Sequence, residues 1–214
     1  LIYRGADTTE FPFHLQPTSD WLMQWQKDFP ELTDKTILAF PGRIAPVKGH
    51  ESFLTLISTL AQENQSIHGL IIGGAEPARK DYERMLHDQI QSLGMQDRIS
   101  FTGHRQDIAE VLSQADLVLS LRTTPEAFGR TTLEPLRIGK PVIGWDEGGV
   151  GEILRKIFPF GAVKAHDMES LKAKVRLWLS KPTYPRESDA FQLSTMCTET
   201  LFVYECLTLK NHTD

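Results

Sequence analysis

Short apolar runs that end in glycine or proline alternate with amphipathic helical patterns along most of the chain. The expected strands are 36–40, 68–72, 98–101, 116–121, 141–144 and 160–163. Between the first two, Phe53, Ile57 and Leu60 recur at helical spacing and predict a helix with one buried face. Strands that are apolar throughout must be covered on both faces, which indicates a parallel sheet. The expected fold class is α/β, a Rossmann-like doubly wound parallel sheet of about six strands with helices on both faces.

Three segments are expected along the chain. Prolines interrupt residues 1–35, where we expect a leading segment with a short helix around Trp21–Trp25. Residues 36–181 contain all the predicted strands and should form the folded domain. Residues 182–214 should form a C-terminal helix and tail.

Charge and cysteine content exclude several classes of protein. The formal net charge of −5 argues against a broad nucleic-acid-binding surface, which needs clustered Lys and Arg. No apolar run is as long as a membrane span and no export leader is evident, so we expect a cytoplasmic protein. Cys197 and Cys206 should lie on opposite sides of one helix, too far apart to form a disulfide. Without Cys or His at zinc-binding spacing, no metal is expected.

The loops that follow the predicted strands carry the candidate site, because ligands of doubly wound sheets bind beyond the C-terminal strand ends. After the first strand, Gly42 and Arg43 are followed by Lys48 at the start of a helix. Two cations and a helix N-terminus suit a phosphate or diphosphate. From the spacing alone, two solvated loop charges explain the pattern equally well.

Later loops add groups suited to a sugar or a nucleoside. Gly73 follows the second strand and would let a ligand approach the backbone, while His104 and Arg105 follow the third and could present main-chain groups to a base. The loop after the fourth strand contains Glu126, and Glu134 lies in the helix that follows. Carboxylates that accept several hydrogen bonds suit a sugar or ribose. For either glutamate alone, a favourable charge at a helix N-terminus or a surface position is the simpler explanation.

Four short motifs follow one another along the chain. They are Gly42-Arg43 with Lys48-Gly49, Glu126-x7-Glu134 with Phe128-Gly129, Gly139–Ile143, and Gly148–Glu152. In this order and spacing the chain, from about Ile2 to Glu205, resembles the donor-binding half of retaining glycosyltransferases with the two-Rossmann GT-B fold, glycosyltransferase family 4 (glycosyl transferases group 1). The Pro125–Arg130 segment is similar to members that build bacterial lipopolysaccharide or other envelope glycans.

The resemblance implies a role for each motif residue. Arg43 and Lys48 would bind the donor diphosphate and stabilise the charge that develops on the leaving group, and Glu126 would lie near the donor sugar. These three are the implied catalytic residues. Glu134 would accept hydrogen bonds from the ribose hydroxyls. The residues implied in nucleotide-sugar binding are Gly42, Gly73, His104, Arg105, Phe128, Gly129, Arg130, Thr131 and Glu134. For Arg130, where the family usually has a small apolar residue, a phosphate contact and a surface charge both remain open.

The resemblance also implies the substrates and the missing parts of the enzyme. The donor would be a UDP- or GDP-linked sugar, with no cofactor and no metal. Residues 1–35 would be an interdomain linker, 36–181 the donor-binding domain, and 182–214 a crossing helix and tail packed against an absent N-terminal half. That half would bind a glycan or lipid-linked acceptor, so the isolated chain should be inactive. The full-length enzyme would associate peripherally with the cytoplasmic face of the inner membrane.

Two alternatives from other functional classes remain at this point. One is a different GT-B enzyme, a sugar-nucleotide epimerase or a phosphorylase; the latter would need a lysine such as Lys140 or Lys164 near a pyridoxal group. The other is a non-catalytic nucleotide-binding module. A dinucleotide dehydrogenase is disfavoured, because no G-x-G-x-x-G follows the first strand.

Overall fold

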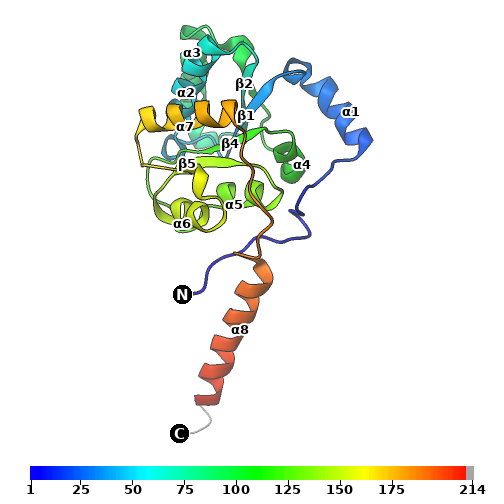
Figure 1. Ribbon diagram of the computed structural model, residues 1–214, viewed down its shortest axis with the longest axis vertical. Coiled ribbons are helices and arrows are strands. Elements are labelled where there is room, and N and C mark those ends of the chain that lie inside the picture. The colour runs from blue at the N-terminus through cyan, green and yellow to red at the C-terminus, as the bar shows by residue number, and fades with distance from the viewer. Residues whose placement is uncertain (211–214) are drawn as a thin grey trace.

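The predicted sheet is confirmed. In the computed structural model, which describes residues 1–210, six parallel strands form one sheet in the order β3-β2-β1-β4-β5-β6 (Figure 1). The strands are β1 (Thr36–Pro41), β2 (Ile67–Ile72), β3 (Ile99–Phe101), β4 (Leu117–Ser120), β5 (Val142–Trp145) and β6 (Ala162–Val163). The strand order reverses between β1 and β4, so the chain leaves these neighbours toward opposite faces and a crevice opens beyond their C-terminal ends.

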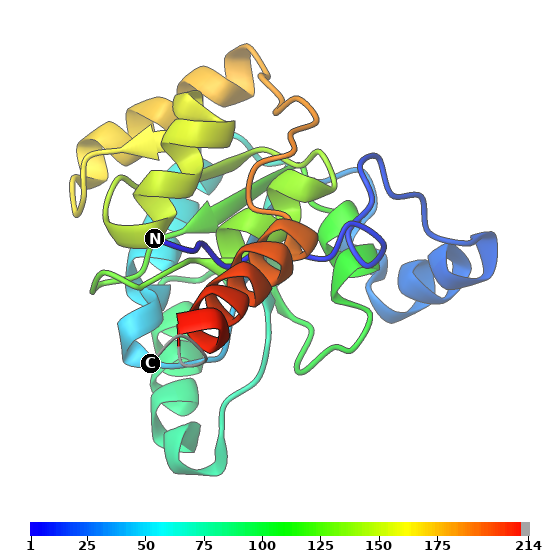
Figure 2. The same cartoon turned by 90° about the horizontal axis from the view of Figure 1, so that it is seen from below.

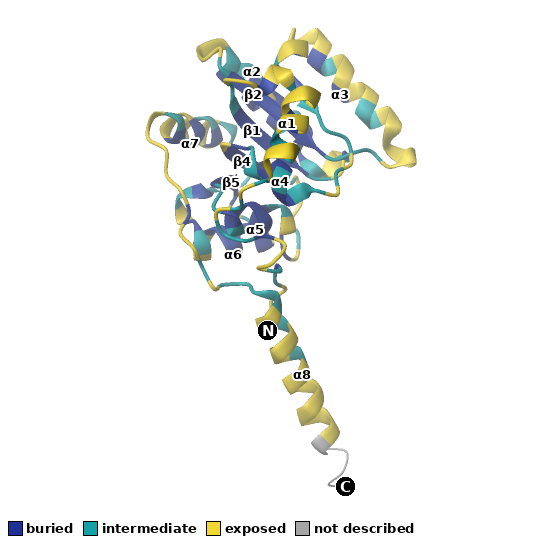
Figure 3. Ribbon diagram, turned by 90° about the vertical axis from the view of Figure 1, so that its right-hand side faces the viewer, coloured by how far each residue is buried: buried dark blue, intermediate teal, exposed yellow. Residues whose placement is uncertain are grey.

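Helices cover both faces of the sheet, as a doubly wound fold requires. They are α1 (Ser19–Asp28), α2 (His50–Glu63), α3 (Lys80–Ser92), α4 (Ile108–Ser113), α5 (Arg130–Arg137), α6 (Gly148–Ile157), α7 (Met168–Ser180) and α8 (Leu193–Lys210). Buried residues of α2, α3 and α7 form one core cluster, while those of α1, α4, α5 and α6 form a second. Figure 3 shows the buried strands between these helices.

The last strand is shorter than the pattern 160–163 predicts. Only Ala162–Val163 pairs with β5, because residues Pro159–Gly161 form a 3₁₀ turn. Proline at the first position of that turn favours it, since its φ is already fixed near the required value. Other 3₁₀ turns are Pro30–Leu32, Pro46–Lys48, Pro77–Arg79 and Gln96–Arg98.

The leading segment packs on the sheet domain. The helix expected around Trp21–Trp25 is present as α1, and Trp25 is buried in the second core cluster together with Phe11 and Leu32. Burying large apolar side chains of this kind contributes about 1.5–3 kcal/mol each. The boundary at residue 35 stays a prediction, but these contacts attach the segment before it to the core.

The C-terminal helix α8 begins beside Ala6, which accepts a hydrogen bond from Leu193, and then extends away from the sheet domain (Figures 1 and 3). Figure 2 shows the same helix end-on, in front of the domain. Leu201, Phe202 and Tyr204 are exposed along it. Cys197 and Cys206 are both exposed and free. Within residues 1–210, no helix is both long and apolar enough to cross a membrane.

A histidine lies fully buried at the start of α2. The His50 ring packs edge-on against Phe40, with centroids 4.9 Å apart, and against Tyr82 at 5.9 Å. Desolvation lowers the pKa of His50 from 6.5 to about 4, so the ring is neutral near pH 7.

We expect this histidine to make the fold acid-sensitive. Between pH 6.5 and about 4 the unfolded chain binds a proton at His50 that the folded chain does not. The free energy of unfolding should therefore fall as the pH drops through this range, by up to about 3 kcal/mol. His50→Leu should flatten the slope, measured by urea denaturation at several pH values. An unchanged slope in the variant would contradict the assignment.

Candidate functional site

A cavity of about 570 Å³ lies beyond the C-terminal ends of β1 and β2, and the start of α5, which follows β4, closes its other side. It brings together most of the site residues predicted from the sequence. Those that line it are Gly42, Arg43, Lys48, Gly73, His104, Arg105, Arg130, Thr131 and Glu134. Three residues of the prediction lie outside the lining: Glu126, Phe128 and Gly129.

One wall of the cavity is cationic. Arg43 extends into solvent and forms an ion pair with Glu76, while Lys48 is largely buried, with 18% of its side chain exposed. Desolvation lowers the pKa of Lys48, and the nearby carboxylate of Glu126 opposes that effect. These two cations remain within reach of an anion in the cavity.

A close backbone contact fixes the position of Lys48. The 3₁₀ turn Pro46–Lys48 ends at Gly49, which has φ +89° and precedes α2. A Cβ at this position would lie 1.9 Å from the carbonyl oxygen of Leu121, the residue just after β4. Only glycine allows this approach, which explains the Lys48-Gly49 motif in physical terms.

Glu126 lies outside the cavity lining but contacts Lys48, which is part of that lining. Its Oε2 lies 3.8 Å from Lys48 Nζ and 3.3 Å from Arg122 Nη1. Arg122 Nε also donates to the carbonyl oxygen of Thr124 at 2.9 Å, which shapes this loop. Sequence reasoning missed Arg122, although its position just after β4, in a loop expected to carry the site, was an available signal.

Phe128 and Gly129 belong to a loop that packs on the start of α6. Gly149 donates its backbone N–H to the carbonyl oxygen of Glu126 at 2.8 Å. Phe128 itself lines a neighbouring cavity of about 520 Å³, which shares Arg130 and Glu134 with the first. The two motifs in this region, one before α5 and one opening α6, therefore form one packing unit.

The buried carboxylate of the site is Glu134. The residue is 7% exposed, and its Oε1 accepts a hydrogen bond from Arg130 Nε at 2.7 Å. Burial raises the pKa of Glu134, and the Arg130 charge opposes this rise. Neither reading of Arg130 from the sequence foresaw its contact with Glu134.

The third wall is the loop that carries His104 and Arg105. In the described part of the chain, the backbone N–H groups of these two residues donate no hydrogen bond to protein. An amide donor beside a cavity is available to a ligand. Cations, a buried carboxylate and free amides together suit an anionic ligand that also carries hydroxyls and a polar ring.

Other groups considered from the sequence lie elsewhere. Lys140 precedes β5, so in this parallel sheet it lies at the edge opposite the cavity. Its pKa is lowered by desolvation, with Asp116 opposing. Among residues 1–210, no group of three or more His, Cys, Asp or Glu side chains is placed to hold a metal ion.

Comparison with known proteins identifies similar chains. The sequence pattern of the family described as "Glycosyl transferases group 1" matches residues 23–191. Mannosylfructose-phosphate synthase from Agrobacterium fabrum is 31% identical over 70% of this chain and 33% of its own length. D-inositol 3-phosphate glycosyltransferase from Mycobacteroides abscessus is 30% identical over 58% of this chain and 27% of its own length. The chain thus spans about a third of these relatives.

Solved structures share the fold. Alr3699/HepE from Anabaena, in complex with UDP, superposes with a TM-score of 0.80 at 23% identity, covering 96% of this chain and 57% of that chain. The UDP-glucose complex of that protein superposes with a TM-score of 0.70 at 26% identity, and the match covers 83% of this chain and 47% of that chain. The C-terminal domain of LpcC from Francisella tularensis superposes with a TM-score of 0.67 at 23% identity, and the match covers 83% of this chain and 89% of that chain.

The contact between α6 and the Glu126 loop can be tested by adding a methyl group. A Cβ at Gly149 would lie 2.0 Å from the carbonyl oxygen of Phe128, so Gly149→Ala must displace the loop. We expect the free energy of unfolding to fall by about 2–4 kcal/mol, measured by urea denaturation.

Gly74→Ala is the matched control, because a Cβ there has no neighbour closer than 3.6 Å. Its stability should stay within about 1 kcal/mol of the native chain. Equal losses in both variants would show that the backbone contact is unimportant.

Proposed function

Because the chain belongs to the glycosyl transferases group 1 family, we propose that it is the donor-binding half of a retaining glycosyltransferase. Its ligand is a nucleoside-diphosphate sugar, UDP- or GDP-linked. Alr3699/HepE, whose structures hold UDP and UDP-glucose, supports this choice of ligand class. Because the chain spans about a third of its curated relatives, a second half that binds the acceptor completes the enzyme in this proposal.

The observation that carries the proposal is that cationic side chains, a buried carboxylate and a loop whose backbone amides donate to no other described residue all line one cavity. Arg43 and Lys48 supply positive charge for the diphosphate, and Glu134 supplies the acceptor for ribose hydroxyls. When the bond between the sugar and the diphosphate breaks, negative charge grows on the departing oxygen. Lys48, which is held in position before a donor binds, stabilises that charge without reorganising, and electrostatic stabilisation of this kind is usually the largest contribution to catalysis.

Glu126 has a separate role in this proposal. Without a donor, its carboxylate is shared between Lys48 and Arg122. A bound diphosphate competes for Lys48, and Arg122 then keeps Glu126 oriented toward the donor sugar. In the same proposal the Phe128–Gly129 backbone, which packs against the start of α6, donates hydrogen bonds to the sugar hydroxyls or the phosphate.

The acceptor and the pathway form the finer part of the proposal. The Pro125–Arg130 segment is similar to enzymes that build bacterial lipopolysaccharide or other envelope glycans. We therefore propose a glycan or lipid-linked acceptor, with the complete enzyme bound peripherally at the cytoplasmic face of the inner membrane. The complete enzyme should form a product with retained anomeric configuration, and the isolated chain should form none. Nucleotide binding without turnover by the complete protein would instead indicate a non-catalytic module.

The diphosphate contact is tested by ligand-induced stabilisation. At about 100 times its Kd, UDP or GDP should raise the Tm of the native chain by roughly 5–10 °C. Lys48→Met, which keeps most of the aliphatic stem, should weaken binding at least about tenfold and reduce the shift. Lys164→Met is the control, because Lys164 is exposed and lies outside the cavity lining. If neither nucleotide stabilises the native chain, the proposed function is wrong.

The role of Glu134 is tested with a pair of nucleotides that differ in one hydroxyl. Native protein should bind UDP about tenfold more tightly than 2′-deoxy-UDP, because the buried Glu134 carboxylate accepts a hydrogen bond from the 2′-hydroxyl that the second nucleotide lacks. Glu134→Gln should weaken UDP binding and reduce this ratio, measured by calorimetry; the guanosine pair replaces it where GDP binds better. A ratio identical to that of the native chain would mean that Glu134 does not contact the 2′-hydroxyl of the ribose.

A further inference from the structure

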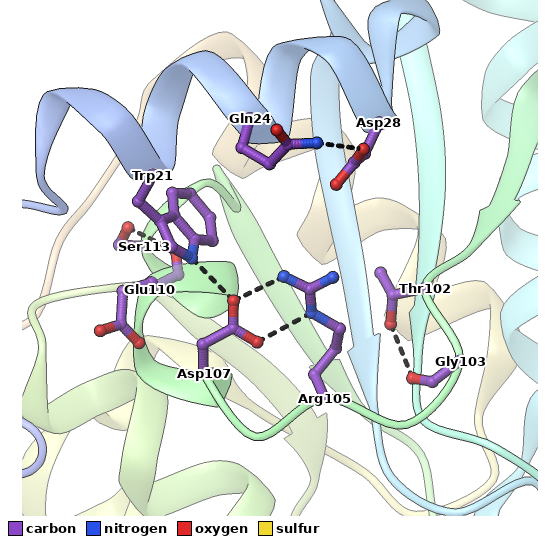
Figure 4. Close-up of polar contacts among 9 residues, drawn as sticks. All are labelled: Trp21, Gln24, Asp28, Thr102, Gly103, Arg105, Asp107, Glu110 and Ser113. Carbon is purple, nitrogen blue, oxygen red and sulfur yellow. Dashed lines mark hydrogen bonds and ion pairs between the residues drawn. The ribbon is translucent and has the colours of Figure 1, made fainter.

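A carboxylate beside the cavity connects two segments that are far apart in the sequence. Asp107 Oδ1 accepts from Arg105 Nε at 2.8 Å, and its Oδ2 accepts from Arg105 Nη2 at 2.5 Å (Figure 4). The same Oδ2 accepts from Trp21 Nε1, on α1, at 2.7 Å, across 86 residues of sequence. The two-point contact with Arg105 fixes the guanidinium plane as well as its position.

Asp107 directly precedes α4, where an aspartate normally caps the helix by accepting a backbone N–H. Here its side chain makes no capping hydrogen bond. Although desolvation raises the pKa of Asp107, hydrogen bonds from Arg105 and Trp21 hold it below its ordinary value. The carboxylate is therefore ionised, and it accepts hydrogen bonds from these two side chains instead of capping the helix.

Aromatic rings of α1 complete the enclosure of Arg105. The guanidinium carbon lies 5.8 Å from the ring centroid of Trp25, within the range of a cation–π contact. The rings of Trp21 and Trp25 stack with their centroids 5.3 Å apart. Trp25 is also buried in the core, so α1 is a fixed support for the Arg105 side chain.

The loop that carries Arg105 lies at the cavity. His104 and Arg105 both line it, and their backbone N–H groups donate to no other described residue. Hydrogen bonds weaken steeply when the angle or the distance departs from its optimum. A loop that could shift would therefore bind different bases about equally well, whereas a loop tied to α1 presents its amides in one geometry.

We propose that Trp21 and Asp107 are positioning residues for the base of the nucleotide: through Arg105 they hold the 103–105 loop in the one geometry that discriminates between bases. This inference rests on the proposed nucleoside-diphosphate site. It assigns α1, a helix outside the predicted nucleotide-binding domain, to the choice of donor. Neither residue touches the ligand itself.

The test measures base preference. Calorimetry with UDP, CDP, GDP and ADP gives two pairs whose members share the ribose diphosphate and differ mainly in an oxo or amino group on the base. Native protein should prefer one member of at least one pair. Trp21→Phe removes the N–H donor and keeps an aromatic ring, and Asp107→Asn removes the charge. Each should reduce that preference about three- to tenfold, while the affinity for the weaker member stays unchanged.

Gln24→Ala is the matched control, because Gln24 lies on α1 and bonds only to Asp28 among the described residues. It should keep the native preference. If Trp21→Phe and Asp107→Asn weaken all four nucleotides equally, or change none, the contacts only stabilise the fold and the inference is overturned. Equal affinity of the native chain within both pairs also overturns it and leaves the diphosphate site intact. If the native chain binds none of the four, the proposed function fails as well.

Discussion

The site depends on two places at the C-terminal edge of the sheet where the backbones of neighbouring loops touch directly. Gly49 lies against the carbonyl of Leu121, and Gly149 lies against that of Phe128. A single methyl group at either place would collide with main-chain atoms, which cannot move as a flexible side chain does. These contacts place the loops after β1, β4 and β5 at fixed positions relative to one another. Lys48 and Glu126 are close because their loops are held in this way.

The charges of the site are paired within the protein. Glu126 is shared by Lys48 and Arg122, Glu134 accepts from Arg130, and Arg105 is held by Asp107. A partly buried charge without a partner would be costly, so these pairs offset part of that cost and orient each side chain. An anionic ligand that enters the cavity competes for Lys48, and the neighbouring cation Arg122 compensates Glu126. A site built in this way is ordered before the ligand arrives, which reduces the entropy lost on binding.

Much of the fold and part of the site could be predicted from the sequence. The strands 36–40 and 68–72 were found within a residue or so, because apolar runs bounded by glycine are strong local signals. The loops that line the cavity followed from the rule that parallel strands end at one edge. The sequence could not indicate that Glu126 lies outside the cavity lining and contacts Lys48 and Arg122. The direction of a loop side chain depends on its tertiary neighbours. The shortening of the strand 160–163 was also missed, because a 3₁₀ turn at Pro159 has a similar apolar pattern.

The sequence by itself determined the parallel sheet, the loops that follow the C-terminal ends of its strands and the types of charge they carry. Periodicity and turn residues act within a few positions, so they can be recognised without knowing the rest of the fold. Only the tertiary structure decided which side chains meet. Trp21 and Asp107 bond across 86 residues, and no local pattern encodes that contact. It exists because Phe11, Trp25 and Leu32 bury the leading segment against the sheet, and that packing brings α1 beside Arg105 and Asp107.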